Sequence, residues 1–192
     1  MNFVRAIVKE NVSLQKIDSL AWDENWYLYN FIPPTEEEPY EKIWKTQDEQ
    51  TTIHYIEDSL INIRYFLVEG KSREEILEQI RSSLETFEKD EIVEMIKNSV
   101  EPIQYVHAIY HVGVAATQNY DSEFFELFKS AFCHSDVKVR NAAILSTGYA
   151  GWQEFQQPLD LLKTSDPDPI VREFAAYTLE SLAKHNWKES IE

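Results

Sequence analysis

The sequence predicts an α+β fold that is mainly α-helical, with a small N-terminal antiparallel β region packed on a C-terminal helical repeat region. Three observations support this prediction. Residues 61–68 alternate with a period of two, which is typical of a β-strand. After Ser72, apolar residues recur with the period of an amphipathic helix. Three of the later helical segments also align with one another, at offsets of 35 and 32 residues.

Short β-branched and aromatic runs between turn residues indicate the N-terminal strands. In the last of them, Ile61, Ile63, Tyr65 and Leu67 form one wholly apolar row. The polar segment 47–50 separates two runs and predicts a hairpin with a four-residue loop. Pro33 and Pro34 end an earlier strand, and we expect residues 35–39 to form an exposed loop. The strands expected are residues 26–32, 41–46, 51–57 and 61–68.

The remaining chain reads as helices joined by short connections, which indicates antiparallel neighbours. Ser72 and Glu75 have the spacing of a capping box at the start of the first helix, and Ile76, Ile80, Leu84 and Phe87 follow on one stripe. We expect residues 1–70 and 71–192 to be two regions of one cooperative unit. The further helices expected are residues 90–98, 102–117, 122–133, 136–149, 155–163 and 169–185.

Small residues recur at equivalent positions of the aligned segments. Ala108, Ala143 and Ala175 share one position, where a small side chain allows neighbouring helices to approach closely. Gly113 and Gly148 share another. Because glycine costs about 1 kcal/mol relative to alanine inside a helix, we expect a packing reason for both glycines. Such periods are typical of stacked helix pairs, since a single pair cannot bury its own apolar face.

Charged residues recur with the same period. Asp136 and Asp168 each begin a helix, and Arg140 or Arg172 follows four residues later. An acid at a helix start and a base one turn later suit both the helix dipole and side-chain pairing. We therefore expect each arginine to pair with the aspartate at the start of its own or an adjacent repeat. The alternative is that the arginines line a ligand-binding surface.

The segments 136–143 and 166–176, with the sequences DVKVRNAA and DPDPIVREFAA, resemble HEAT repeats, particularly the short form of phycobiliprotein lyases. The resemblance covers roughly residues 100–185 and is weaker in a third unit, which has Tyr105 at the place of the arginine. It implies a helical solenoid of two to three repeats, capped by the N-terminal region. The resemblance does not imply one function, because HEAT repeats occur in adaptors, inhibitors, immunity proteins of bacterial toxin systems, lyase subunits and alkylpurine glycosylases.

Composition restricts the classes of partner. The formal net charge is −16, which repels phosphate backbones, so nucleic acid is not an expected partner. Cys133 is the single cysteine, and no signal peptide is readable, which favours a cytoplasmic location. Residues 102–120 lack charged side chains but include several polar ones, so we interpret them as a buried helix and expect no membrane partner.

Catalytic motifs are not recognisable, so neither an enzyme nor a cofactor is expected. His107 and His111 lie four residues apart on one expected helix and could reach a single metal. Local spacing supplies no third ligand, so packing is the favoured interpretation and metal binding the alternative. Cys133 and His134 are sequence neighbours, which gives a nucleophile and its base no favoured geometry.

Aromatic residues near acidic ones form the second candidate site. Glu36, Glu37, Glu38 and Glu41 accompany Trp22, Trp26, Tyr40 and Trp44. These aromatic residues either anchor a basic protein partner or, as we favour, build the core of the sheet. Residues 1–58 carry five basic and twelve acidic side chains, which supports the binding alternative. Trp152 is either a hydrophobic contact at a helix end or an exposed anchor.

Together these features predict a non-enzymatic protein-binding HEAT-repeat module. It would be an adaptor, or an immunity or inhibitor protein whose acidic surface binds a basic partner. The concave face of the solenoid and the N-terminal region are both candidate binding surfaces. The resemblance also implies an alternative, a phycobiliprotein-lyase-like enzyme or subunit acting on a tetrapyrrole. No feature of the sequence indicates an oligomeric state.

Overall fold

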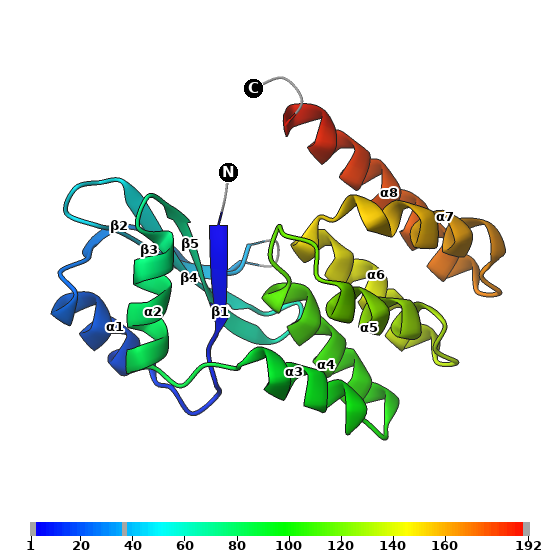
Figure 1. Ribbon diagram of the computed structural model, residues 1–192, viewed down its shortest axis with the longest axis horizontal. Helices are drawn as coiled ribbons and strands as arrows, with labels where there is room; N and C mark the ends of the chain where they lie inside the picture. The colour runs from blue at the N-terminus through cyan, green and yellow to red at the C-terminus, as the bar shows by residue number, and fades with distance from the viewer. Residues whose placement is uncertain (1–2, 36–37, 190–192) are drawn as a thin grey trace. The chain divides into compact units, whose positions relative to one another are not determined.

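The computed structural model describes residues 3–35 and 38–189, with side chains of the last helix described as far as Ala183. These residues form a five-stranded antiparallel sheet and eight α-helices, which confirms the predicted α+β class and the N-terminal sheet (Figure 1). They divide into two compact units, Met1–Lys89 and Asp90–Glu192. No helix in this described part of the chain is long and apolar enough to cross a membrane.

The sheet of the first unit has the strand order β1-β5-β4-β3-β2. The predicted strands are confirmed to within three residues at each end, whereas β1 was not predicted. Glu36 and Glu37 of the expected exposed loop lie outside the described residues. The strand bounds are β1 Phe3–Ile7, β2 Tyr27–Ile32, β3 Tyr40–Lys45, β4 Thr51–Asp58 and β5 Ile63–Gly70.

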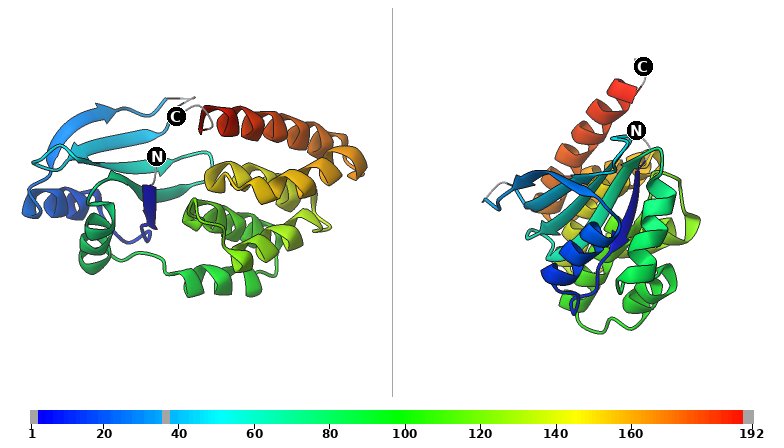
Figure 2. Two further views of the ribbon diagram at one scale, coloured as in Figure 1. Left: turned by 45° about the horizontal axis from the view of Figure 1, so that its top comes forward. Right: turned by 90° about the vertical axis from the view of Figure 1, so that its left-hand side faces the viewer.

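One face of the sheet carries the core of the first unit. Tyr55, Phe66 and Val68 are fully buried on it, together with residues of helices α1 (Leu14–Asp23) and α2 (Arg73–Ser83). Figure 2 shows the two helices on the same side of the sheet. Because side chains alternate along a strand, the apolar row of β5 noted in the sequence, which includes Tyr65, lies on the opposite face.

Helix α1 was not predicted, although its signals are present in the sequence. Ser13 is its N-cap, and the Ser13 hydroxyl accepts a hydrogen bond from the backbone amide of Lys16 at 3.3 Å. Ile17, Leu20 and Ala21 are its buried residues. This stripe covers little more than one turn, so the helical period was too short to stand out among the neighbouring strands.

Helix α2 belongs to the first unit, so the expected boundary at residue 70 is about one helix too early. The helix packs on β1 and β5, because Ile76, Leu77 and Ile80 complete the core of the sheet. The capping box predicted at Ser72 is wrong. The Ser72 side chain makes no cap hydrogen bond, and its backbone amide instead donates to Thr51 Oγ1 at 3.0 Å, which ties the helix start to β4.

The second unit consists of helices in two rows (Figure 1). Helix α4 contacts α6 and α6 contacts α8, while α5 and α7 contact each other in a second row. The predicted helices are confirmed, with a short 3-10 turn, Gln153–Phe155, before α7. The bounds are α3 Lys89–Lys97, α4 Pro102–Ala115, α5 Ser122–Phe132, α6 Val137–Ala150, α7 Gln156–Ser165 and α8 Pro169–Glu189.

The small residues of the repeat have different roles. Ala108, Ala143 and Ala175 are at most 1% exposed, in agreement with a close helix approach. At Gly113 a Cβ atom would lie 2.8 Å from Ser146 Cβ, so the expected packing reason is confirmed there. At Gly148 a Cβ would meet nothing within 4 Å, and the expectation is wrong because this residue lies on an exposed side of α6.

The turns before α6 and α8 are built alike. Asp136 Oδ1 accepts from the backbone amide of Lys138 at 2.7 Å, and Asp168 Oδ1 accepts from that of Ile170 at 2.8 Å, so both predicted N-terminal caps are confirmed. Arg140 Nη1 donates to two carbonyl oxygens of its own turn, those of residues 134 and 135. Arg172 Nη1 donates to those of residues 166 and 167, so each arginine closes the turn that precedes its helix.

Arg140 pairs with a carboxylate of the adjacent repeat, as predicted, but with Asp166 and not with the helix-starting Asp168. Its Nε donates to Asp166 Oδ2 at 2.8 Å and its Nη2 to Asp166 Oδ1 at 2.9 Å, a bidentate pair between buried side chains. The partner precedes Asp168 by two residues. For Arg172 the prediction is wrong, since no carboxylate of the described chain pairs with it. Tyr105, at the corresponding place in α4, donates to Ser130 Oγ at 3.4 Å.

Candidate functional site

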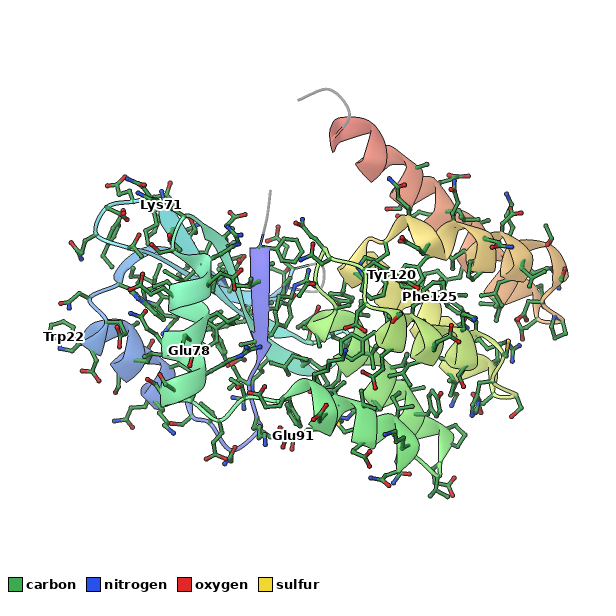
Figure 3. All side chains as sticks on the ribbon, viewed as in Figure 1. Trp22, Lys71, Glu78, Glu91, Tyr120 and Phe125 are labelled. Atoms are coloured by element: carbon green, nitrogen blue, oxygen red, sulfur yellow. The ribbon has the colours of Figure 1, made fainter. Side chains whose placement is uncertain are left out.

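The aromatic residues of the N-terminal region do not form one surface. Trp26 and Trp44 are 7% and 4% exposed, and their ring centroids lie 6.5 Å apart in the core of the sheet. Tyr40 packs against the same core and makes an edge contact with Tyr55. Of the four aromatic residues predicted as binding anchors here, Trp22 alone is largely exposed, at 83%, and Figure 3 shows it pointing outward from α1. The core interpretation therefore applies to Trp26 and Trp44.

Trp152 is a buried contact at the end of α6. Its indole Nε1 donates to the carbonyl oxygen of Thr117 at 2.7 Å, and its ring stacks on Phe155 with centroids 5.4 Å apart. Tyr120, labelled in Figure 3, meets the same indole at 5.4 Å. Trp152 is only 3% exposed, so it anchors the loop after α4 to the helices around it and is not a free binding anchor.

A groove of about 620 Å³ lies along α4, α6 and α8 of the second unit. Its volume falls within the range of about 300–1,000 Å³ that is usual for ligand sites. Its walls are mainly apolar, with Val106 and Tyr110 from α4, Leu145 from α6 and Phe174 from α8. The groove follows the row of helices that carries the repeat. The other lining residues are Glu101, Pro102, Ile103, Asp136, Lys138, Asn141 and Ala142.

Tyr110 and Asn141 are the two uncharged polar residues of the groove lining. The side-chain oxygen of Asn141 is buried and unpartnered. Tyr110 is half-buried, and this burial raises the pKa of its hydroxyl above the ordinary value. An unsatisfied buried acceptor costs about 1–3 kcal/mol.

Charged residues lie at the end of the groove where α4 and α6 begin. Glu101 caps α4 with Gln104, and Asp136 caps α6. Lys138 is the basic residue of the lining. None of the groove residues except Asp136 was among the predicted site residues. In the repeat helices these residues lie on the side opposite to the packing alanine. The single sequence shows that side only as an ordinary apolar stripe.

The histidine pair of α4 is brought together by the helix. The rings of His107 and His111 meet edge to face, with centroids 4.5 Å apart, and His111 Nδ1 bonds to the carbonyl oxygen of His107 at 2.9 Å. Among the side chains that the structure describes, those of residues 3–35 and 38–183, no group of three metal-ligating residues gathers there or elsewhere. His111 is 3% exposed, and burial lowers its pKa to about 4.

Acid is therefore expected to destabilise the second unit through His111. Between pH 6.5 and 4 the unfolded chain binds a proton at this residue that the folded unit does not, so stability falls as the pH falls. The expected loss from pH 7.5 to pH 5 is about 2 kcal/mol. Urea unfolding of the wild type and of His111→Leu at both pH values measures it. The wild type should lose about 2 kcal/mol more than the variant, and His107→Leu should behave like the wild type.

Two further histidines have fixed hydrogen bonds. His134 Nδ1 accepts from the backbone amide of Asp136 at 3.0 Å, so this nitrogen is not free to take a proton from Cys133. His54 Nδ1 bonds to Glu41 Oε1 at 2.6 Å across β3 and β4. The other ring nitrogen of His54 is buried without a hydrogen bond in the described chain. This Glu–His pair was not predicted, because its members lie on different strands.

Comparison with known proteins adds no relative, since family models, curated proteins and solved structures all give no match to this chain.

Proposed function

We propose that the chain is a non-enzymatic protein-binding module, in which the second unit is a HEAT-like solenoid that holds a segment of a basic partner protein in the groove along α4, α6 and α8. The observation that carries this proposal is the groove itself, whose mainly apolar walls come from three helices of one row. A peptide segment matches these walls, because it offers apolar side chains together with backbone donors and acceptors.

The HEAT-like assignment is supported by the repetition of the turns. The hydrogen bonds of Arg140 and Arg172 reach carbonyl oxygens that are separated by the same 32 residues as the arginines themselves. The two rows of helices are those that stacked helix pairs form. In such an arrangement the row α4, α6 and α8 provides one continuous binding face.

The charge of the second unit favours a basic partner. Residues 90–192 carry eight Lys and Arg against sixteen Asp and Glu. Arg140 is engaged by Asp166 and Arg172 by its own turn, which leaves the acidic side chains in excess. This field attracts a partner segment with Lys or Arg beside its apolar residues and makes the association sensitive to salt.

Site-directed photocrosslinking tests this proposal. Benzoylphenylalanine replaces Leu145 in the groove or, as control, Leu161, which is 65% exposed on α7 outside the groove. In lysate of the host, we expect the variant with the crosslinker at position 145 to capture a basic protein at low salt and less of it at high salt. The variant with the crosslinker at position 161 should capture none. With the captured protein purified, Val106→Arg should weaken binding at least tenfold, because it places a positive charge on an apolar wall.

Equal capture from both positions, or unchanged binding by Val106→Arg, would contradict the proposal. A bilin that changes its absorption spectrum on mixing with the wild type, and not with Val106→Arg, would instead favour the tetrapyrrole alternative. Leu161→Arg introduces the same charge away from the groove and should bind the partner as the wild type does.

A further inference from the structure

Strand β2 is an edge of the sheet that carries neither a charged residue nor a proline within its own length. It lies at the end of the strand order, next to β3 alone. Its six residues, YLYNFI, carry no charge. Leu28, Tyr29 and Phe31 are 58%, 59% and 47% exposed. Exposed edge strands normally carry charges or proline, since an open apolar edge invites pairing with another chain.

The outer backbone of β2 is open for pairing. Apart from the ladder with β3, no residue of β2 makes a backbone hydrogen bond in the described chain. A bulge between Leu28 and Asn30 shifts the register once, and Phe31 and Ile32 then pair regularly with β3. The strand therefore presents unpaired donors and acceptors on the side away from β3.

Apolar side chains lie beside this open edge. Leu28 and Phe31 pair with Trp44 and Lys42, so they project to the face of the sheet that carries the core. The Phe31 ring meets the edge-on ring of Tyr40 at 5.3 Å. A strand added at β2 would cover the exposed parts of Leu28 and Phe31, and thus gain apolar burial along with main-chain hydrogen bonds.

We propose that β2 docks an extended, basic segment of a partner protein as a sixth strand of the sheet. This inference concerns the first unit and does not rest on the groove. The acidic residues that flank β2 disfavour a second copy of this chain as the strand that pairs with it. Asp23 and Glu24 precede β2 and three glutamates, residues 36–38, follow it. Two β2 strands paired in either direction would bring acidic flanks together, whereas Lys or Arg on a partner strand would face them favourably.

The test uses the full chain and a displayed library of random ten-residue peptides. Selection on the wild type is compared with selection on Leu28→Lys, which puts a positive charge on the edge strand, and on Leu60→Lys. Leu60 is 70% exposed in the turn between β4 and β5, so it controls for the same change of charge in the same unit. The enriched peptides are synthesised and their dissociation constants measured with each protein.

Enriched peptides are expected to alternate apolar residues with Lys or Arg and to slow hydrogen exchange at the amides of residues 27–32. Leu28→Lys should weaken their binding at least tenfold, and Leu60→Lys less than twofold. Methylation of alternate peptide nitrogens should also cost at least tenfold, since it removes main-chain donors that a strand needs. The groove variant Val106→Arg should bind these peptides normally, which separates this site from the groove.

Three results would overturn the inference. The first is that selection on the wild type enriches no peptides beyond those that selection on Leu28→Lys enriches. The second is equal binding of the methylated peptides, which would mean charge attraction without strand pairing. The third is reversible self-association of the wild type that Leu28→Lys abolishes, which would make a second copy the occupant of β2.

Discussion

Replacing Asp166 with alanine is expected to destabilise the second unit by about 3–5 kcal/mol, because the change leaves the charge of Arg140 buried without its partner. The two side chains are 9% and 3% exposed, so water cannot replace the lost carboxylate. The substitution also removes the acceptor for the backbone amide of Asp168, which Asp166 Oδ1 holds at 2.9 Å. Urea unfolding followed by the helical circular dichroism signal measures the effect.

Three further variants test whether the loss of stability comes from breaking the buried Arg140–Asp166 pair and not from removing any charged side chain. Asp160→Ala removes an exposed carboxylate from α7 and should change stability by less than about 0.5 kcal/mol. Arg172→Ala removes turn hydrogen bonds without an ion pair and should cost about 1–2 kcal/mol. The double variant Arg140→Leu with Asp166→Leu should be more stable than Asp166→Ala, because it leaves no unpaired buried charge. A double variant that is the less stable of the two would contradict this explanation.

The sequence predicted the second unit well because its signals are local and repeated. The Asp136 and Asp168 caps and the packing alanines each depend on a few neighbouring residues, and each occurs at least twice. The exact partner of Arg140 was less accessible. Asp166 lies 26 residues away, and three aspartates within residues 160–168 were equally available by charge.

The first unit was predicted less completely because its features depend on pairing between distant strands. The free edge at β2 follows from the order of all five strands, which one sequence does not specify. Burial of Trp26 and Trp44, as against exposure of Trp22, depends in the same way on which face of the sheet α1 and α2 cover. Composition alone made these three tryptophans look equivalent.

The groove could not be predicted from periodicity, because an apolar stripe looks the same whether it faces a neighbouring helix or solvent. Val106 and Leu145 satisfy the helical period just as the buried Ile109 and Ile144 do. Only the packing of α4, α6 and α8 separates the two sets. The unpartnered oxygen of Asn141 is likewise a property of packing, since the sequence places an ordinary polar residue in a helix there.

Alanine substitutions at the two aligned helix glycines are expected to have opposite effects. Gly113→Ala should destabilise the second unit by about 3 kcal/mol, the upper part of the range for overpacked cores. The new Cβ would lie 2.8 Å from Ser146 Cβ and 2.9 Å from the Ser146 carbonyl oxygen. Because the backbone of α6 is among these neighbours, a side-chain rotation cannot relieve the clash, and α4 and α6 must move apart.

Gly148→Ala makes the same chemical change at the equivalent position of α6, where a Cβ has open space. Without a clash, the higher helix propensity of alanine should stabilise the unit by up to about 1 kcal/mol. Urea unfolding of both variants against the wild type measures the difference in sign. The double variant Gly113→Ala with Ser146→Gly should recover only part of the loss, since the carbonyl oxygen of residue 146 remains. If Gly113→Ala were instead neutral or stabilising, α4 and α6 would not approach each other as closely as the fold requires, and the repeat would owe its packing to the alanines alone.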